Sequence, residues 1–308
     1  MNHAPGTLVT IIAAFAAGVS SLCLEHSPQR TAPPARSGYV QSIEAWRAQR
    51  EADLKAEDGW LSLVGLFWLQ EGVNRVGGDP AADVPLPAGS APRAVGTITF
   101  ENRIARFSPA AGADVRVNGR PARDGILRPQ PGDYDSVTTG TVTFFVIKRG
   151  ERYGVRVRDS GSPARTAFAG LHWYPIREEY RVRAQFRPHP SPTSIPITNV
   201  LGATEPWPTP GTVVFTLKGR EYTLHPVLDG PDARELFFIF RDRTTGVETY
   251  PGGRFLYSAL PVDGAVDLDF NKAHNPPCAF TPFATCPVPP RENALPLAIE
   301  AGERDPHR

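Results

Sequence analysis

The chain has 308 residues, of which 33 are Lys or Arg and 32 are Asp or Glu, so its formal net charge is +1. This balance argues against a nucleic-acid-binding protein, because a surface that follows phosphates needs a clear surplus of Lys and Arg. The 28 Gly and 33 Pro are about a fifth of the chain, against roughly 12% in average proteins, and disfavour a helical bundle. With 41% hydrophobic residues, the chain can still bury one or two sizeable cores.

Residues 1–24 predict a signal peptide or an N-terminal anchor. Residues 4–24 carry no charge, and residues 8–19 have the length of a signal-peptide hydrophobic segment and are short for a membrane span. We therefore expect an exported protein of the periplasm or cell envelope, which meets a membrane only through this segment. Lipidation of Cys23 is disfavoured because Leu22 precedes it, where a small residue is required.

Residues 25–58 predict a Pro-rich tether followed by a surface helix. Residues 43–55 contain few β-branched residues and a Glu51/Lys55 pair four residues apart, which stabilises a helix. Ser42 is expected to cap the helix, and Asp58-Gly59 to end it.

After residue 58 the sequence predicts two β domains, at 59–160 and 161–308, divided by the break at 160–163. The apolar run 60–69 fits either a strand or a short buried helix. Lys218-Gly219 predicts a turn between two strands. Expected strands are 95–107, 113–117, 142–148, 153–157, 181–186, 212–217, 222–224, 235–241, 254–258 and 265–270. The expected fold is all-β: a β-sandwich, then a second β-sandwich or partial barrel, with one N-terminal helix.

Cys278 and Cys286 lie in a Pro-rich loop with seven residues between them. In an exported chain such a pair predicts a disulfide. The alternative is a zinc site of His274, Cys278 and Cys286, but this spacing lacks the paired C-x2-C arrangement of structural zinc. We therefore expect no metal ion and no cofactor.

The densest polar cluster in the sequence lies in the second β domain. If Phe270 points into a core, Asp269 and Asn271 share the opposite face, and Arg254 could pair with Asp269 from a neighbouring strand. One interpretation is a pocket in which Arg254 orients an anionic group and a nearby acid or base handles a proton. The other, which we favour, is that these side chains tie Pro-rich loops to the sheet. The candidate ligand-binding residues are Asp242, Arg254, Asp269, Asn271, His274, Glu292 and Asn293.

The first β domain resembles a forkhead-associated (FHA) domain, a β-sandwich that binds phosphothreonine. The resemblance rests on the segments 76–78, 83–86, 92–98 and 117–119. It implies that the phosphate-contacting Arg is replaced by Gly78 and the phosphate-binding Ser by Pro92. Because neither residue offers a side-chain donor, we expect an FHA-like fold that does not bind phosphothreonine peptides.

From Trp60 onward the motifs resemble a bacterial family known as domain of unknown function 1684. They occupy 59–63, 65–69, 153–159, 170–175, 252–256, 268–271, 275–280, 286–287 and 292–293. His274 departs from the family pattern, where an aromatic residue such as Tyr is expected. The resemblance implies no established activity.

The expected function is therefore binding or scaffolding in the cell envelope, with a small molecule or envelope component bound by the second β domain. The alternative is a cofactor-independent or metal-assisted hydrolase that uses Arg254, Asp269, His274 and Glu292. No G-x-S-x-G nucleophile motif is present, so no catalytic residue is assigned and enzymatic activity is left open.

Overall fold

The computed structural model describes residues 38–230 and 232–308, which belong to one compact unit. The predicted signal peptide, Cys23 and the tether up to residue 37 lie outside the described residues. None of the helices in the described ranges is long and apolar enough to cross a membrane.

The long helix α1 (Gly38–Lys55) begins earlier than the sequence indicated. Ser42 is not its cap but lies inside it, with its hydroxyl donating to the Tyr39 carbonyl at 2.7 Å. The apolar residues of α1 are few, but Ile43 and Leu54 are fully buried. Polar side chains complete its packing: Glu51, for example, accepts from the indole N–H of Trp173 at 3.2 Å.

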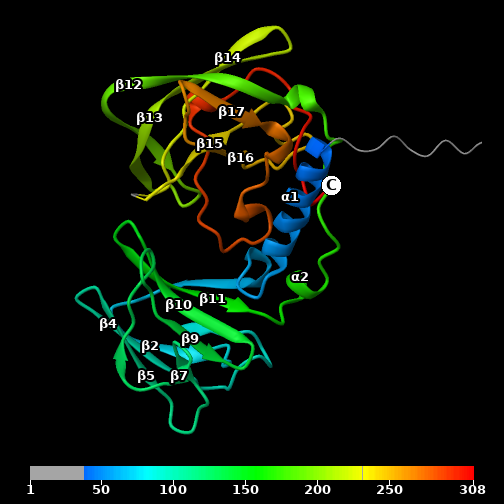
Figure 1. The fold of residues 1–308 in the computed structure, drawn as a ribbon. Coiled ribbons are helices and arrows are strands. Elements are labelled where there is room, and N and C mark those ends of the chain that lie inside the picture. Colours follow the sequence, from blue (N-terminus) through cyan, green and yellow to red (C-terminus); the bar gives the residue numbers. More distant parts are fainter. Residues whose placement is uncertain (1–37, 231) are drawn as a thin grey trace, which may run out of the picture. The chain divides into compact units, whose positions relative to one another are not determined.

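Residues 63–159 form the β-sandwich in the lower part of Figure 1. One sheet has the order β1-β11-β10-β9-β6-β7 and the other β3-β2-β4-β5-β8. The apolar run at 60–69 becomes a 3-10 turn (Trp60–Ser62) followed by strand β1. The strands are β1 (Leu63–Trp68), β2 (Gly72–Gly77), β3 (Val84–Pro85), β4 (Gly96–Glu101), β5 (Ile104–Pro109), β6 (Arg116–Val117), β7 (Arg120–Pro121), β8 (Gly125–Ile126), β9 (Ser136–Thr139), β10 (Val142–Arg149) and β11 (Arg152–Asp159).

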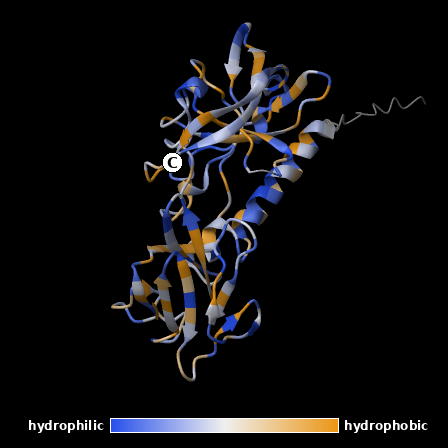
Figure 2. Ribbon diagram, turned by 90° about the vertical axis from the view of Figure 1, so that its left-hand side faces the viewer, coloured by the Kyte–Doolittle hydropathy of each residue, from blue (hydrophilic) through white to orange (hydrophobic). Residues whose placement is uncertain are grey.

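The segment 95–107, predicted as one strand, is a hairpin of β4 and β5. Asn102 and Arg103 form its two-residue turn with φ of 51° and 64°, the left-handed conformation that tight hairpin turns require. Along the strands hydrophobic and hydrophilic residues alternate (Figure 2). The inward residues, such as Ile98, Phe107, Phe144, Val155 and Val157, form a single core.

The C-terminal region contains a four-stranded sheet, β14-β13-β12-β17, and a separate hairpin, β15-β16. The predicted turn at Lys218-Gly219 joins β13 to β14. The expected all-β fold with one N-terminal helix is confirmed, and the described strands do not close into a barrel. The strands are β12 (Arg181–Thr198), β13 (Thr204–Leu217), β14 (Arg220–Leu224), β15 (Glu235–Phe240), β16 (Arg254–Ala259) and β17 (Ala265–Asp269), after a short helix α2 (Pro163–Thr166).

The β15-β16 hairpin is buried on both faces and forms the middle layer of this region. Leu236, Phe238 and Leu256 pack against the four-stranded sheet. Phe237 and Phe255 point to the opposite side, into a second cluster that includes Trp60 from the start of the sandwich and both described cysteines. A buried hydrogen bond from the Thr281 hydroxyl to the Leu63 carbonyl (2.9 Å) also ties the C-terminal loops to β1. The hairpin thus separates an apolar core from a more polar space beside the sandwich.

Candidate functional site

Arg254 belongs to the framework and not to a ligand site. Its side chain is 0% exposed and donates to the Asp242 carboxylate at 2.9 Å. It also donates to the carbonyls of Ile299 and Ala301, which fixes the C-terminal segment against β16. The expected pairing of Arg254 with Asp269 is wrong, since β17 pairs with β12 and Asp242 supplies the carboxylate. Both terminal nitrogens of Arg254 therefore already have partners within the protein.

Asn271, Asn275 and Asn293 hold irregular segments by side-chain-to-backbone hydrogen bonds. The Asn271 amide donates to the Arg177 carbonyl at 2.9 Å, and the Asn293 amide donates to the carbonyls of His225 and Ile239 at 3.0 Å. Glu292, next to Asn293, is exposed. These contacts match the loop-tying interpretation of the polar cluster.

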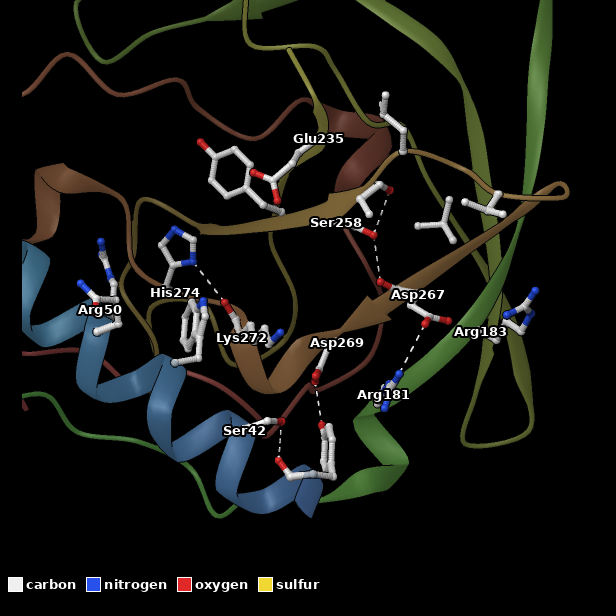
Figure 3. Close-up of a pocket in the computed structure, with 18 of the residues that line it drawn as sticks. Ser42, Arg50, Arg181, Arg183, Glu235, Ser258, Asp267, Asp269, Lys272 and His274 are labelled. Carbon is white, nitrogen blue, oxygen red and sulfur yellow. Dashed lines mark hydrogen bonds and ion pairs between the residues drawn. The ribbon is translucent and has the colours of Figure 1, made fainter. Parts of the chain in front are cut away.

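Asp269 and His274 are the two candidate residues that line one pocket. This polar pocket, about 740 Å³, lies between α1 and strands β16 and β17 (Figure 3). The Tyr39 hydroxyl donates to Asp269 at 2.9 Å, and Arg181 pairs with Asp267 at 3.4 Å. Asp267 and Asp269 therefore already have partners in the protein.

His274 forms a wall of the polar pocket as a neutral ring. Its Nδ1 lies 3.1 Å from the Lys272 carbonyl, which can only accept, so Nδ1 carries the proton and Nε2 is left as an acceptor (Figure 3). Burial lowers the pKa of His274 to about 3, and the nearby Arg50 guanidinium lowers it further. The ring stacks on Tyr257 at 6.0 Å, which fixes its plane.

On the other side of His274, Tyr257 and Arg50 lies a second space of about 900 Å³, which we call the arginine pocket. Its apolar walls include Trp60, Trp207 and Phe237. Four cationic side chains line it, against two carboxylates, Glu205 and Asp229, both on exposed residues. The charged residues are Arg50, Lys148, Arg149, Arg156, Glu205 and Asp229.

Arg156 is the most unusual of these cations. Only 3% of the residue is exposed, and its Nε has no hydrogen-bond partner. Within the described residues its guanidinium joins no ion pair with a carboxylate, and it lies over the Trp60 ring, 5.5 Å from the ring centroid. Burial, together with the charges of Arg149 and Arg158, lowers the pKa of Arg156 to about 10, so the group is still charged at neutral pH.

Strand alternation brings Arg156 to this position. In β11, Val155 and Val157 point into the sandwich core, so Arg156 and Arg158 point to the outer face. Arg149, at the end of the adjacent strand β10, donates to the Thr285 hydroxyl at 3.3 Å and also lines the arginine pocket. Arg149 and Arg156 thus both line this pocket, and Glu205 and Asp229 are the carboxylates nearest in effect to Arg149.

The same pocket contains an unused acceptor. Asn275 is 0% exposed, and its amide donates to Glu303 at 2.8 Å and to the Arg304 carbonyl at 2.7 Å. Its Oδ1 has no hydrogen-bond partner. Arg156 and Asn275, which both line this pocket, thus each leave one buried polar atom unpaired.

Cys278 and Cys286 lie next to each other, with the Cys278 backbone N–H donating to the Cys286 sulfur at 3.1 Å. Both are free thiols here, so the predicted disulfide is not shown and stays a prediction. In residues 38–230 and 232–308, no three His, Cys, Asp or Glu side chains are grouped closely enough to hold a metal ion.

The sequence did not single out Arg149, Arg156 or Trp60 as site residues. The signal was present in the run Val155-Arg156-Val157-Arg158, in which arginines alternate with β-branched residues. Such a strand presents two cations on one face. What covers that face is set by residues more than 40 positions away, such as Trp207 and Cys286.

No curated protein matches the chain. A solution structure of an uncharacterised protein from Haloarcula marismortui is 35% identical and covers 46% of this chain and 78% of its own, with a TM-score of 0.39. The FHA domain of FhaA, solved with the intracellular domain of another protein, is 19% identical and covers 30% of this chain and 97% of its own (TM-score 0.22). A structure from a study of phosphothreonine-dependent FHA interactions is 19% identical, with coverages of 30% and 92% (TM-score 0.21).

The family model described as "Protein of unknown function (DUF1684)" matches residues 166–304. The matched range contains the predicted family motifs from 170 onward, and those at 59–69 and 153–159 lie before it. The chain belongs to the DUF1684 family.

Proposed function

We propose that the protein is a binding protein for a small anionic molecule with a flat or apolar body, which it holds in the arginine pocket. The observation that carries the proposal is Arg156, a charged group that is 97% buried and lacks a counter-ion. Burying a charge without a partner costs on the order of several kcal/mol. A bound anion removes this cost and gains charge-assisted hydrogen bonds, which are about twice as strong as neutral ones.

The walls of the arginine pocket indicate which other chemical groups the ligand carries besides its anionic group. Trp60, Trp207 and Phe237 offer flat apolar surface. The ligand therefore combines an acidic group with an aromatic or otherwise apolar part, and a space of about 900 Å³ suits a molecule of cofactor or metabolite size.

Binding is tested by titration calorimetry with 1-naphthalenesulfonate and with 1-naphthalenesulfonamide, which has the same shape without the charge. We expect the sulfonate to bind at least about tenfold more tightly, because a hydrogen bond to a charged group contributes about 1.5–3 kcal/mol. Arg156→Gln should weaken the sulfonate by a similar factor and leave the sulfonamide unchanged. Equal affinities of the wild type for the two molecules would refute the proposal.

Arg152→Gln is the matched control. Arg152 lies on the same strand, β11, but is exposed and does not line the arginine pocket. Its replacement should leave both affinities unchanged. Arg149→Gln provides a second variant within the pocket if Arg156→Gln proves difficult to fold, and it should weaken the sulfonate alone.

The proposal includes export to the cell envelope, which the uncharged segment 4–24 favours. Cell fractionation tests it: the full-length chain should be found in the envelope or periplasm, and a chain starting at residue 25 in the cytoplasm. The same distribution for both chains would contradict export. The proposed ligand is neither a nucleic acid nor a phosphothreonine peptide, in keeping with the balanced charge and with Gly78 and Pro92.

A further inference from the structure

Two thiols lie at the edge of the arginine pocket. Cys286 is 6% exposed and lines the pocket, and Cys278 lies in the 3-10 turn Pro277–Ala279 beside it. The Cys278 backbone N–H donates to the Cys286 sulfur at 3.1 Å, which places the two cysteines side by side. We infer that their sulfurs can exchange with each other.

The charges around this pair favour one thiolate. Arg156 is the cation facing the sulfurs, and Arg149 and Arg158 stand behind it. On the other side, the Tyr250 hydroxyl donates to the Cys278 carbonyl at 3.0 Å, and the His307 ring contacts the Ala279 carbonyl at 2.9 Å. Hydrogen bonding with Cys286, together with the charge of Arg156, lowers the pKa of Cys278 to about 7. The pKa of Cys286 is raised, because the two sulfurs share one proton and Cys286 is buried.

We propose that Cys278 and Cys286 form a thiol–disulfide pair whose oxidation state sets the affinity of the arginine pocket for its anion. The first part concerns the sulfurs alone, whereas the second part rests on the proposed function. The oxidant is a small-molecule disulfide. The Cys278 thiolate attacks one of its sulfurs and releases one thiolate. The Cys286 sulfur then attacks Cys278, forms the protein disulfide and releases the second thiolate. Two protein thiols and one small disulfide thus become one protein disulfide and two small thiols.

The effect on binding follows from the shared cation. In the reduced protein the thiolate offsets the charge of Arg156, so a ligand anion meets a weaker positive field. The disulfide is neutral, so the oxidised protein presents the full charge of Arg156 to the ligand. Because linkage is reciprocal, a bound anion must in turn make the Cys278 thiol harder to deprotonate and slower to react.

The sulfur chemistry is tested with 4,4′-dithiodipyridine, a neutral disulfide whose released thione absorbs light, on a full-length chain carrying Cys23→Ser. The parent should release two thiones and end with a Cys278–Cys286 disulfide. Adding Cys286→Ser should stop the reaction at one thione, with the adduct on Cys278. Adding Cys278→Ser should slow the reaction at pH 7 at least about tenfold, since thiolate reacts and thiol does not. Equal rates for the two serine variants, or a parent that keeps two adducts, would overturn the assignment.

The coupling is tested by titrating 1-naphthalenesulfonate, whose charge is constant with pH, into the reduced and oxidised forms of the same Cys23→Ser chain. At pH 8 the oxidised form should bind about fivefold more tightly or better. At pH 5.5, where Cys278 is protonated, the two forms should agree within about twofold. Binding that is equal in both forms at pH 8 would overturn the coupling and leave the proposed function standing. The absence of sulfonate binding in both forms would instead refute the proposed function.

Discussion

Two almost fully buried arginines in this protein have opposite surroundings. Arg254 donates to the Asp242 carboxylate and to two backbone carbonyls. Arg156, on the outer face of the sandwich, has an aromatic ring and other arginines around it and no carboxylate. Arg254 thus has a counter-ion within the chain, although its Nε is unpaired, whereas Arg156 has no carboxylate partner. We propose that an anion from outside supplies the missing partner of Arg156. Burial of a charged residue therefore does not by itself indicate a functional site. The partners that the residue has, or lacks, are more informative.

The largest expected effect on stability comes from breaking the Arg254–Asp242 pair. Arg254→Met should lower the free energy of unfolding by about 3–5 kcal/mol, because it leaves the buried Asp242 carboxylate without its counter-ion. Urea unfolding followed by circular dichroism measures this loss. Arg243→Met, at the exposed residue next to Asp242, is the control and should change stability by no more than about 0.5 kcal/mol. A loss below about 1 kcal/mol for Arg254→Met would show that the pair does not stabilise the fold.

Glu303 is an intermediate case, a buried carboxyl with partners that do not fully offset its burial. Burial raises the pKa of Glu303 to about 7, although Arg50 and Asn275 act in the opposite direction. The folded-state pKa of Glu303 is above its unfolded value of 4.5. The contribution of Glu303 to folding stability is therefore greatest below about pH 4.5, where its carboxyl is protonated, and is lost as pH rises to about 7. Ionisation of Glu303 should lower the free energy of unfolding by at most about 3 kcal/mol across this pH range.

Glu303→Gln should remove this pH dependence. The difference in unfolding free energy between the variant and the wild type, measured in urea at pH 5, 6, 7 and 8, should shift in favour of the variant as pH rises. Other titrating groups cancel in this difference. A difference that stays constant over the four pH values would contradict the raised pKa.

For Arg156→Met we do not expect the loss of stability expected for Arg254→Met, so this variant tests the comparison of the two arginines. Because the removed charge has no carboxylate partner in the protein, the free energy of unfolding should stay the same or rise by about 1 kcal/mol in ligand-free buffer. The measurement is again urea unfolding. A loss of about 2 kcal/mol or more would mean that Arg156 stabilises the fold as Arg254 does, and the contrast between them would fail.

A third arginine, Arg103, is exposed, in contrast to the buried Arg254 and Arg156. It pairs with Glu151 in solvent, where an ion pair contributes about 0–1 kcal/mol, and its φ of 64° favours glycine. Arg103→Gly, which creates an Asn-Gly turn, should therefore raise stability by about 0.5 kcal/mol. Thermal unfolding measures this change. Arg106→Gly, inside β5, is the counterpart that should lower stability, and a clear loss of stability for Arg103→Gly would contradict the prediction.

Much of the fold follows from local sequence. Alternating patterns locate β10, β11 and β14 within a few residues, and Lys218-Gly219 marks its turn. The errors arise where the local signal is weak. Asn102-Arg103 turns the chain although arginine rarely takes a positive φ, and β12 and β13 continue through several prolines that strands usually exclude.

The site was harder to predict because partner choice is a long-range property. Asp242 and Asp269 are both carboxylates within 15 residues of Arg254, and only the fold shows that Asp242 is the partner. Similarly, Arg156 is a charged residue on a strand face that could equally face water. Its role depends on the C-terminal segments that cover that face, including Cys286 and Asn275.

The most direct test of the account is to locate an anion at Arg156. Crystals of the full-length protein soaked in sodium selenate should give an anomalous peak within about 3.5 Å of an Arg156 guanidinium nitrogen, and crystals of Arg156→Met should lack that peak. Selenate bound at exposed arginines with none at Arg156 in the wild type would contradict the central claim.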